Sequence, residues 1–200
     1  TAVMPVMNGV SAGQQLAEHL QKGIIVDSVI YTVSSAGQDY AITQKGNYTY
    51  LNIGSHAKSA EGQAAADEIA ALLNGAEVDC KVSEDVQAAI WKKYVLNCAF
   101  NVATARWGCT IGELAADPAR RAECRALMAE AAAVAAELGV KLPADLVDKH
   151  MVTMMEKTTP DSDSSLSRDF DAGKTGEMEV FSGYMVRKAK ELGVPAPVSE

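Results

Sequence analysis

Apolar and polar positions follow two different patterns along the chain, and the change falls near residue 82. Before it, short runs rich in β-branched and aromatic residues are separated by glycine-containing turns, one of them at 45–47. Such runs are typical of strands, whereas apolar residues recurring every three or four positions are typical of helices. The pattern predicts strands at 2–7, 24–35, 39–44, 48–54 and 76–82, and helices at 11–23 and 60–73.

After residue 83 the strand signal disappears and helix signals take over. Ser83, followed by two acidic residues, predicts the N-cap of a long helix that ends near Trp107. A second helix is expected from Asp117-Pro118 to Gly139, because proline suits a first helical turn and glycine suits a helix end. We expect further helices at 144–157 and 177–192, and a loop over most of the polar run 158–176.

Together the two patterns predict an α/β fold followed by an all-α fold. We place an α/β domain at 1–82 and a helical domain at 83–200, and we expect the ligand site in a cleft between them. A chain of 200 residues with 48% hydrophobic content can bury one sizeable core or two smaller ones.

The charge of the chain limits the kinds of binding partner, and its cysteines and histidines indicate its cellular compartment and metal content. The 18 basic and 26 acidic residues give a net charge of −8, which disfavours nucleic acid or an anionic membrane surface as a partner. No stretch approaches the roughly 18 apolar residues of a membrane span. The four cysteines form no C-x-x-C pair, and the three histidines lack an acidic or cysteine partner at a useful spacing. This indicates a cytoplasmic protein with reduced cysteines and no metal site.

A row of polar residues interrupts the apolar helix at 90–101. Lys93, Asn97 and Asn101 drift by only about 80° around a helix, so they form one narrow stripe. Leaving an ammonium and two amides unpaired among apolar neighbours would cost a few kcal/mol. The missing partner is either a polar ligand or an internal hydrogen-bond network, and the residues alone leave both open.

Two further polar positions are candidates for a site. Ser165 lies in a polar turn that leads to Glu177, at the start of a predicted helix where the helix dipole favours a carboxylate. Asn8 follows a predicted strand, and ligands of open α/β sheets bind beyond the carboxyl ends of strands. A capped, solvated turn and a plain Asn-Gly turn are the alternatives. No G-x-G-x-x-G occurs in the chain.

The order of the motifs resembles the ketopantoate reductase (2-dehydropantoate 2-reductase) family over almost the whole chain. Six separated motifs follow "NGV" at 8–10 in family order and at family-like spacing. They are "NIG" at 52–54, "W-K-K-Y-x-x-N-x-x-x-N" at 91–101, "C-x-x-G-E-L" at 109–114, "S-S-L-x-x-D" at 164–169, "E-M-E-x-x-x-G" at 177–183 and "E-L-G-V-P-A-P" at 191–197.

The resemblance implies a two-domain architecture. Residues 1–82 would be the C-terminal half of a Rossmann-like NADP-binding domain. Residues 83–200 would be a helical domain like that of 6-phosphogluconate dehydrogenase-like proteins. The chain does not begin with methionine, so we expect a fragment or a processed chain that lacks the glycine-rich NADP turn and is inactive by itself. A homodimer through the helical domain is a further expectation.

The resemblance also implies roles for individual residues in reducing a 2-keto acid with NADPH. Lys93 matches the family's general acid, and Asn97 and Asn101 match asparagines that hold the substrate. The other matches are Asn8 beside nicotinamide and substrate, Ser165 at the substrate carboxylate, and Glu177 at the cofactor and the substrate hydroxyl.

Three departures from the family pattern keep alternatives open. Ile111 replaces a residue that is often a polar substrate contact, Leu166 replaces a methionine, and Gly176 stands where the family has threonine. The substrate is therefore either ketopantoate or another branched 2-keto acid. From a different class, a helical binding or dimerisation module without catalysis stays possible if the stripe is satisfied internally.

Overall fold

The computed structural model describes residues 1–44, 46 and 48–200 and divides the chain into two compact units, residues 1–90 and 91–200. Lys45 and Asn47 of the predicted turn at 45–47 lie outside the described residues. The division falls inside the long helix α3 (Val86–Trp107). Its first turn packs in the first unit, where Val86 and Ile90 form an apolar cluster with Val29. The domain boundary between residues 82 and 83 stays a prediction.

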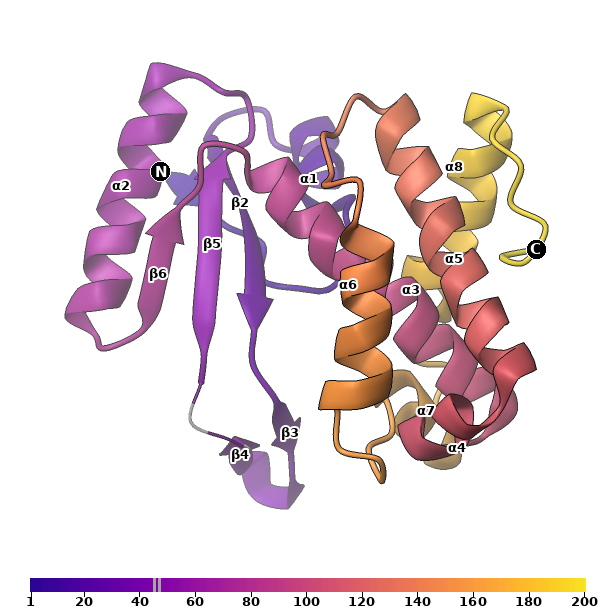
Figure 1. Ribbon diagram of the computed structural model, residues 1–200. Coiled ribbons are helices and arrows are strands. Elements are labelled where there is room, and N and C mark those ends of the chain that lie inside the picture. The colour runs from indigo at the N-terminus through magenta and orange to yellow at the C-terminus, as the bar shows by residue number, and fades with distance from the viewer. Residues whose placement is uncertain (45, 47) are drawn as a thin grey trace. The chain divides into compact units, whose positions relative to one another are not determined.

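The first unit is built on a four-stranded sheet in the order β1-β2-β5-β6 (Figure 1). The strands are β1 (Ala2–Val3), β2 (Ile24–Tyr31), β5 (Tyr50–Ser55) and β6 (Asp79–Val82). β1 pairs with β2 in parallel, β2 with β5 in antiparallel and β5 with β6 in parallel orientation. A separate two-stranded ribbon joins β3 (Ser34–Ala36) to β4 (Ile42–Gln44), with a 3₁₀ turn at Gln38–Tyr40 between them.

Both faces of this sheet are covered. On one face Val26, Leu51 and Ile53 pack against α2 (Ala60–Gly75), whose small alanines allow a close approach. Val29, three residues after Val26 and so on the other face, packs against the start of α3. The mixed α/β fold of this unit agrees with the prediction.

Several predicted elements of the first unit are shorter or divided in the structure. The strand expected at 24–35 is divided into β2 and β3, the one at 39–44 is only β4 after the 3₁₀ turn, and the one at 76–82 is only β6. The strand expected at 2–7 is only Ala2–Val3, because Pro5 has no N–H to donate to a ladder. The chain beyond β1 is held differently, since the Ser28 hydroxyl donates to the Pro5 carbonyl at 2.5 Å. The helix expected at 11–23 is α1 (Ala12–His19), which ends because Leu20 is extended.

The second unit consists of helices. These are the rest of α3, α4 (Ile111–Ala116), α5 (Pro118–Glu137), α6 (Leu146–Val152), α7 (Ser165–Asp171) and α8 (Tyr184–Leu192), with π-helical turns η2 (Thr153–Lys157) and η3 (Glu179–Gly183). α5 packs against α4, α6 and α8 (Figure 1). The core includes Tyr94, Met128 and Phe181, each 1% exposed or less. Every helix within the described ranges is too short or too polar to span a bilayer.

Local capping explains where most of these helices begin and end. The Asp117 carboxylate accepts two backbone N–H groups at the start of α5, and Gly193, with φ 69°, ends α8. Two details differ from the prediction. The cap of α3 is Asp85, whose carboxylate accepts the Ala88 N–H, and not Ser83. The run 158–176 contains α7, which Ser164 caps by accepting the Ser167 N–H.

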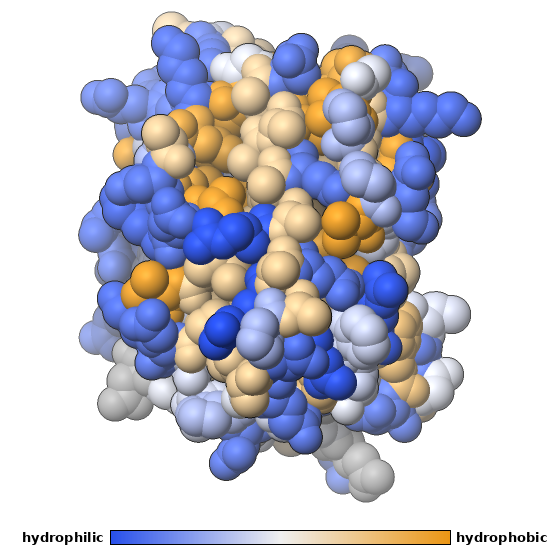
Figure 2. Space-filling model, turned by 45° about the vertical axis from the view of Figure 1, so that its right-hand side comes forward, coloured by the Kyte–Doolittle hydropathy of each residue, from blue (hydrophilic) through white to orange (hydrophobic). Residues whose placement is uncertain are grey.

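The surface carries both hydrophilic and apolar side chains. Figure 2 shows a face on which hydrophilic side chains surround small apolar areas. Large apolar side chains that stay exposed come from separate parts of the chain, among them Leu72, Trp107, Leu138 and Val152.

Candidate functional site

The predicted polar stripe lies along α3. Lys93 and Asn97 are half-buried, and Asn101 is buried, with 4% of its surface exposed. The Asn101 side-chain amide donates to the backbone carbonyl oxygen of Asn97 at 3.3 Å and accepts from the Ser165 hydroxyl at 3.2 Å. Asn101 therefore has internal partners on α3 and at the first residue of α7.

Lys93 is partly shielded from water. Burial lowers the pKa of Lys93 below its ordinary value of 10.5, and the nearby Glu177 carboxylate opposes that shift. Desolvation is the larger effect, because taking a charged form out of water disfavours it. Glu177 itself is half-buried, just before η3. The structure thus brings Lys93 and Glu177, 84 residues apart in the sequence (177 − 93), within electrostatic reach of each other.

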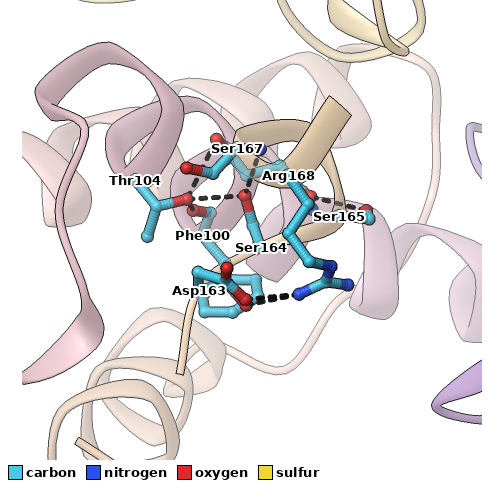
Figure 3. Close-up of polar contacts among 8 residues, drawn as sticks. Phe100, Thr104, Asp163, Ser164, Ser165, Ser167 and Arg168 are labelled. Carbon is cyan, nitrogen blue, oxygen red and sulfur yellow. Dashed lines mark hydrogen bonds and ion pairs between the residues drawn. The ribbon is translucent and has the colours of Figure 1, made fainter. Parts of the chain in front are cut away.

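The start of α7 is held against α3 by hydroxyl groups (Figure 3). Ser164 and Thr104 are both 0% exposed, and their hydroxyl oxygens lie 2.6 Å apart. Ser165 is next to this pair and bonds to Asn101. Arg168 forms an ion pair with Asp163 across the same turn. The structure therefore places Ser165 beside the stripe, which the sequence could suggest only through the family resemblance.

Asn8 belongs to the first unit. It is half-buried between β1 and α1, and Gly9 after it has φ 97°, a left-handed conformation that glycine adopts easily. Its participation in one site with the residues of the second unit stays a prediction.

A buried polar cluster in the first unit was missed from the sequence. Asp27, in the middle of β2, is 3% exposed, and its Oδ2 lies 2.8 Å from His56 Nδ1. The Gln87 amide donates to the same oxygen at 2.6 Å. The cluster joins β2, the end of β5 and the start of α3, so His56 has the acidic partner that sequence spacing did not reveal. A carboxylate inside an apolar strand was the available signal.

Gly13 of α1 is required beside this cluster. A Cβ atom at Gly13 would overlap with the Asp27 carboxylate and would lie 2.7 Å from His56 Nδ1. The close approach of α1 to β2 therefore depends on a residue without a side chain at this position.

Two of the three departures from the family pattern meet in the structure. Gly176 has φ 59°, and a Cβ atom there would lie 2.6 Å from Leu166 Cδ1. A threonine at 176 would need both a different backbone and a shift of Leu166. The third departure, Ile111, is 1% exposed, and its N–H donates to the Ser162 carbonyl.

The described residues offer little for metal or thiol chemistry. They contain no group of three or more His, Cys, Asp or Glu side chains that could hold a metal ion. The four cysteines are buried and unbonded, and burial raises the pKa of Cys98 and of Cys124 to about 12. The thiols act as packing groups.

The fold defines a class of protein in which a Rossmann-like α/β unit precedes an all-helical unit. The family model described as "Ketopantoate reductase PanE/ApbA C terminal" matches residues 85–200, and the chain belongs to the ketopantoate reductase family. A 2-dehydropantoate 2-reductase of Archaeoglobus fulgidus is 27% identical over 197 residues, which cover 98% of this chain and 64% of that protein. The chain thus spans just under two thirds of the length of this relative.

Solved structures are also similar to this chain. The crystal structure of a PanE/ApbA family ketopantoate reductase from Ralstonia eutropha JMP134 has a TM-score of 0.87 and 29% identity, over 100% of this chain and 63% of that one. A structure of D-mandelate dehydrogenase with NADH and anilino(oxo)acetate has a TM-score of 0.88 at 17% identity, over 100% of this chain and 64% of that one, and shares the fold.

Proposed function

We propose that the whole protein reduces 2-dehydropantoate to pantoate with NADPH, in the biosynthesis of pantothenate. The observation that carries the proposal is the half-buried Lys93 on α3, within electrostatic reach of Glu177 and on the same stripe as Asn97 and Asn101. Membership in the ketopantoate reductase family supports it. Because the chain spans 64% of its relative, the proposal concerns the whole protein.

Lys93 would act as the general acid. Reduction of a 2-keto acid adds a hydride to the keto carbon and leaves charge on the oxygen, which an ammonium stabilises and then protonates. A pKa lowered by burial brings the lysine closer to useful acid strength at neutral pH. The Glu177 carboxylate raises that pKa and so favours the charged form of the lysine.

The remaining residues would bind and orient the substrate. Amides donate and accept without adding charge, so Asn97 and Asn101 suit the keto acid's polar groups. Ser165 would donate to the substrate carboxylate. Its hydroxyl already lies 3.2 Å from Asn101 Oδ1, so the two side chains can exchange their mutual bond for bonds to a ligand.

Asn8 and Glu177 would each contact the nicotinamide cofactor. The residues fit such a group, because Gly9 takes a left-handed turn directly after Asn8 and presents backbone without a side chain. When bound, NADPH supplies the hydride. The enzyme would work in the cytoplasm, in keeping with its unbonded cysteines, and light scattering would test whether it forms a homodimer.

Oxidation of NADPH by the whole protein, followed at 2-keto acid concentrations up to saturation, tests the proposal. Saturable turnover with ketopantoate is expected. A faster reaction with another branched 2-keto acid would make that acid the substrate and leave the type of reaction unchanged. An absence of turnover with every 2-keto acid would contradict the enzymatic proposal.

One observation favours a second candidate function. Asn101 is satisfied by Asn97 and Ser165, as a helical binding or dimerisation module without catalysis would require. Such a module would show no saturable response to keto acids or NADPH, and removing the Lys93 ammonium would destabilise it.

A further inference from the structure

The contact between α3 and the start of α7 has two parts with different exposure. Thr104 and Ser164 form a fully buried pair, with their oxygens 2.6 Å apart and 60 residues between them in the sequence. Asn101, three residues before Thr104, meets Ser165, the residue after Ser164, in a second contact. Because Ser164 and Ser165 are consecutive residues, the two contacts are neighbours at the start of α7; Figure 3 labels Thr104, Ser164 and Ser165.

The buried pair fixes where α7 begins. Ser164 is the N-cap of α7, and its Oγ accepts the Ser167 N–H at 3.1 Å. Thr104 lies close to the Phe100 carbonyl as well, at 2.7 Å, which limits the rotation of its hydroxyl. The Thr104 hydroxyl donates to Ser164 Oγ, which also accepts the Ser167 N–H, so this bond joins the α7 cap to α3.

The loop before α7 is anchored independently. The Ile111 N–H donates to the Ser162 carbonyl at 2.9 Å, and the Gly112 N–H donates to the Pro160 carbonyl at 2.8 Å. These bonds hold the loop through its backbone to α4. The bond from Thr104 to Ser164 lies between this anchored loop and Ser165, so it constrains the segment that carries the Ser165 side chain.

We propose that Thr104 is a positioning residue: its buried bond to Ser164 sets the α7 cap so that Ser165 and Asn101 face a 2-keto acid carboxylate as one preorganised pair. The proposal rests on the proposed function. A small movement of α7 would turn the Ser165 hydroxyl away from the ligand, and misplacement of about 1 Å can lower kcat/KM roughly 10²-fold.

Three variants separate the hydroxyl from the rest of the side chain. Thr104→Val keeps the size and branching of the side chain and removes the hydroxyl, and Thr104→Ser keeps the hydroxyl. Thr153→Val is the matched control. Its hydroxyl also donates to a carbonyl four residues earlier, that of Lys149 at 2.9 Å, but Thr153 is exposed and lies outside the proposed site.

Two measurements on the whole protein test the proposal. Hydrogen exchange at the Ser167 amide, which bonds to the cap, should be about tenfold faster in Thr104→Val. For the 2-keto acid, kcat/KM should fall about 10- to 100-fold, mainly through KM, with KM for NADPH within about twofold of wild type. Thr104→Ser and Thr153→Val should retain the wild-type values. Should Thr104→Val not fold, Ser164→Gly removes the same bond from the α7 side, because glycine is tolerated at an N-cap. This variant also removes the acceptor of the Ser167 N–H, so only its kcat/KM for the 2-keto acid is compared.

The possible results bear differently on the inference and on the proposed function. Faster exchange with unchanged kcat/KM would show that the bond is only structural, which overturns the inference and leaves the proposed function standing. Unchanged exchange would overturn it as well. A wild-type protein that turns over no 2-keto acid would remove the proposed function itself, and the inference with it.

Discussion

Replacing Lys93 by methionine separates catalysis from stability at the centre of the proposed site. Methionine keeps a long, unbranched apolar side chain of similar reach and removes the ammonium. Because a positioned general acid contributes about 10²- to 10⁴-fold to a rate, turnover of the whole protein should fall by that factor, or about 3–5 kcal/mol in the barrier.

The same substitution should leave stability unchanged or raise it. Burial lowers the Lys93 pKa, and the attraction of Glu177 offsets this only in part, so the folded chain carries the ammonium at a cost. Between the lowered pKa and 10.5 the unfolded state binds more protons than the folded state, so stability rises with pH in that window. Lys93→Met removes this pH dependence, and its advantage over wild type should shrink as the pH approaches 10.5.

Steady-state NADPH oxidation gives the rate, and urea unfolding at several pH values gives the stability. Lys92→Met is the matched control, because Lys92 is the neighbouring half-buried lysine of α3. Its turnover should be within about threefold of wild type, a difference of less than about 1 kcal/mol. Unchanged turnover in Lys93→Met would remove Lys93 from the mechanism. A clear loss of stability would refute the reasoning about desolvation and would favour the binding-module alternative.

Three further predictions concern packing. Gly13→Ala should destabilise the first unit by about 1–3 kcal/mol in urea unfolding, because the new Cβ overlaps with the Asp27 carboxylate, whereas Gly75→Ala, with open space around it, should stabilise by about 0.5 kcal/mol. Equal effects would refute the packing argument. Tyr94→Phe should lower the free energy of unfolding by about 1–3 kcal/mol, because the Tyr94 hydroxyl donates to two backbone carbonyls of η3, each at 2.9 Å. An unchanged midpoint of urea unfolding would contradict this prediction. Cys98, with its pKa raised to about 12, should resist alkylation at pH 8 until the chain unfolds, as mass spectrometry would show.

Much of the helical unit could be predicted because its signals are local. Asp117-Pro118 marks a helix start and Gly193 a helix end through bonds within a few residues, and in the structure α5 begins and α8 ends at these residues. The spacing of Lys93, Asn97 and Asn101 placed them on one stripe of α3 for the same reason. Local patterns were less reliable in the polar run that contains α7. This helix buries one large apolar side chain, Leu166, so it has no apolar periodicity.

Residue patterns were enough to predict an α/β part followed by a helical part, the stripe on α3 and, through the order of the motifs, the family. Which polar groups meet depends on the packing of the elements: Lys93 with Glu177, Asp27 with His56, and Thr104 with Ser164. These partners are between 29 and 84 residues apart (56 − 27 and 177 − 93). Periodicity and capping act over one or two helical turns, so contacts at such separations depend on how the elements pack.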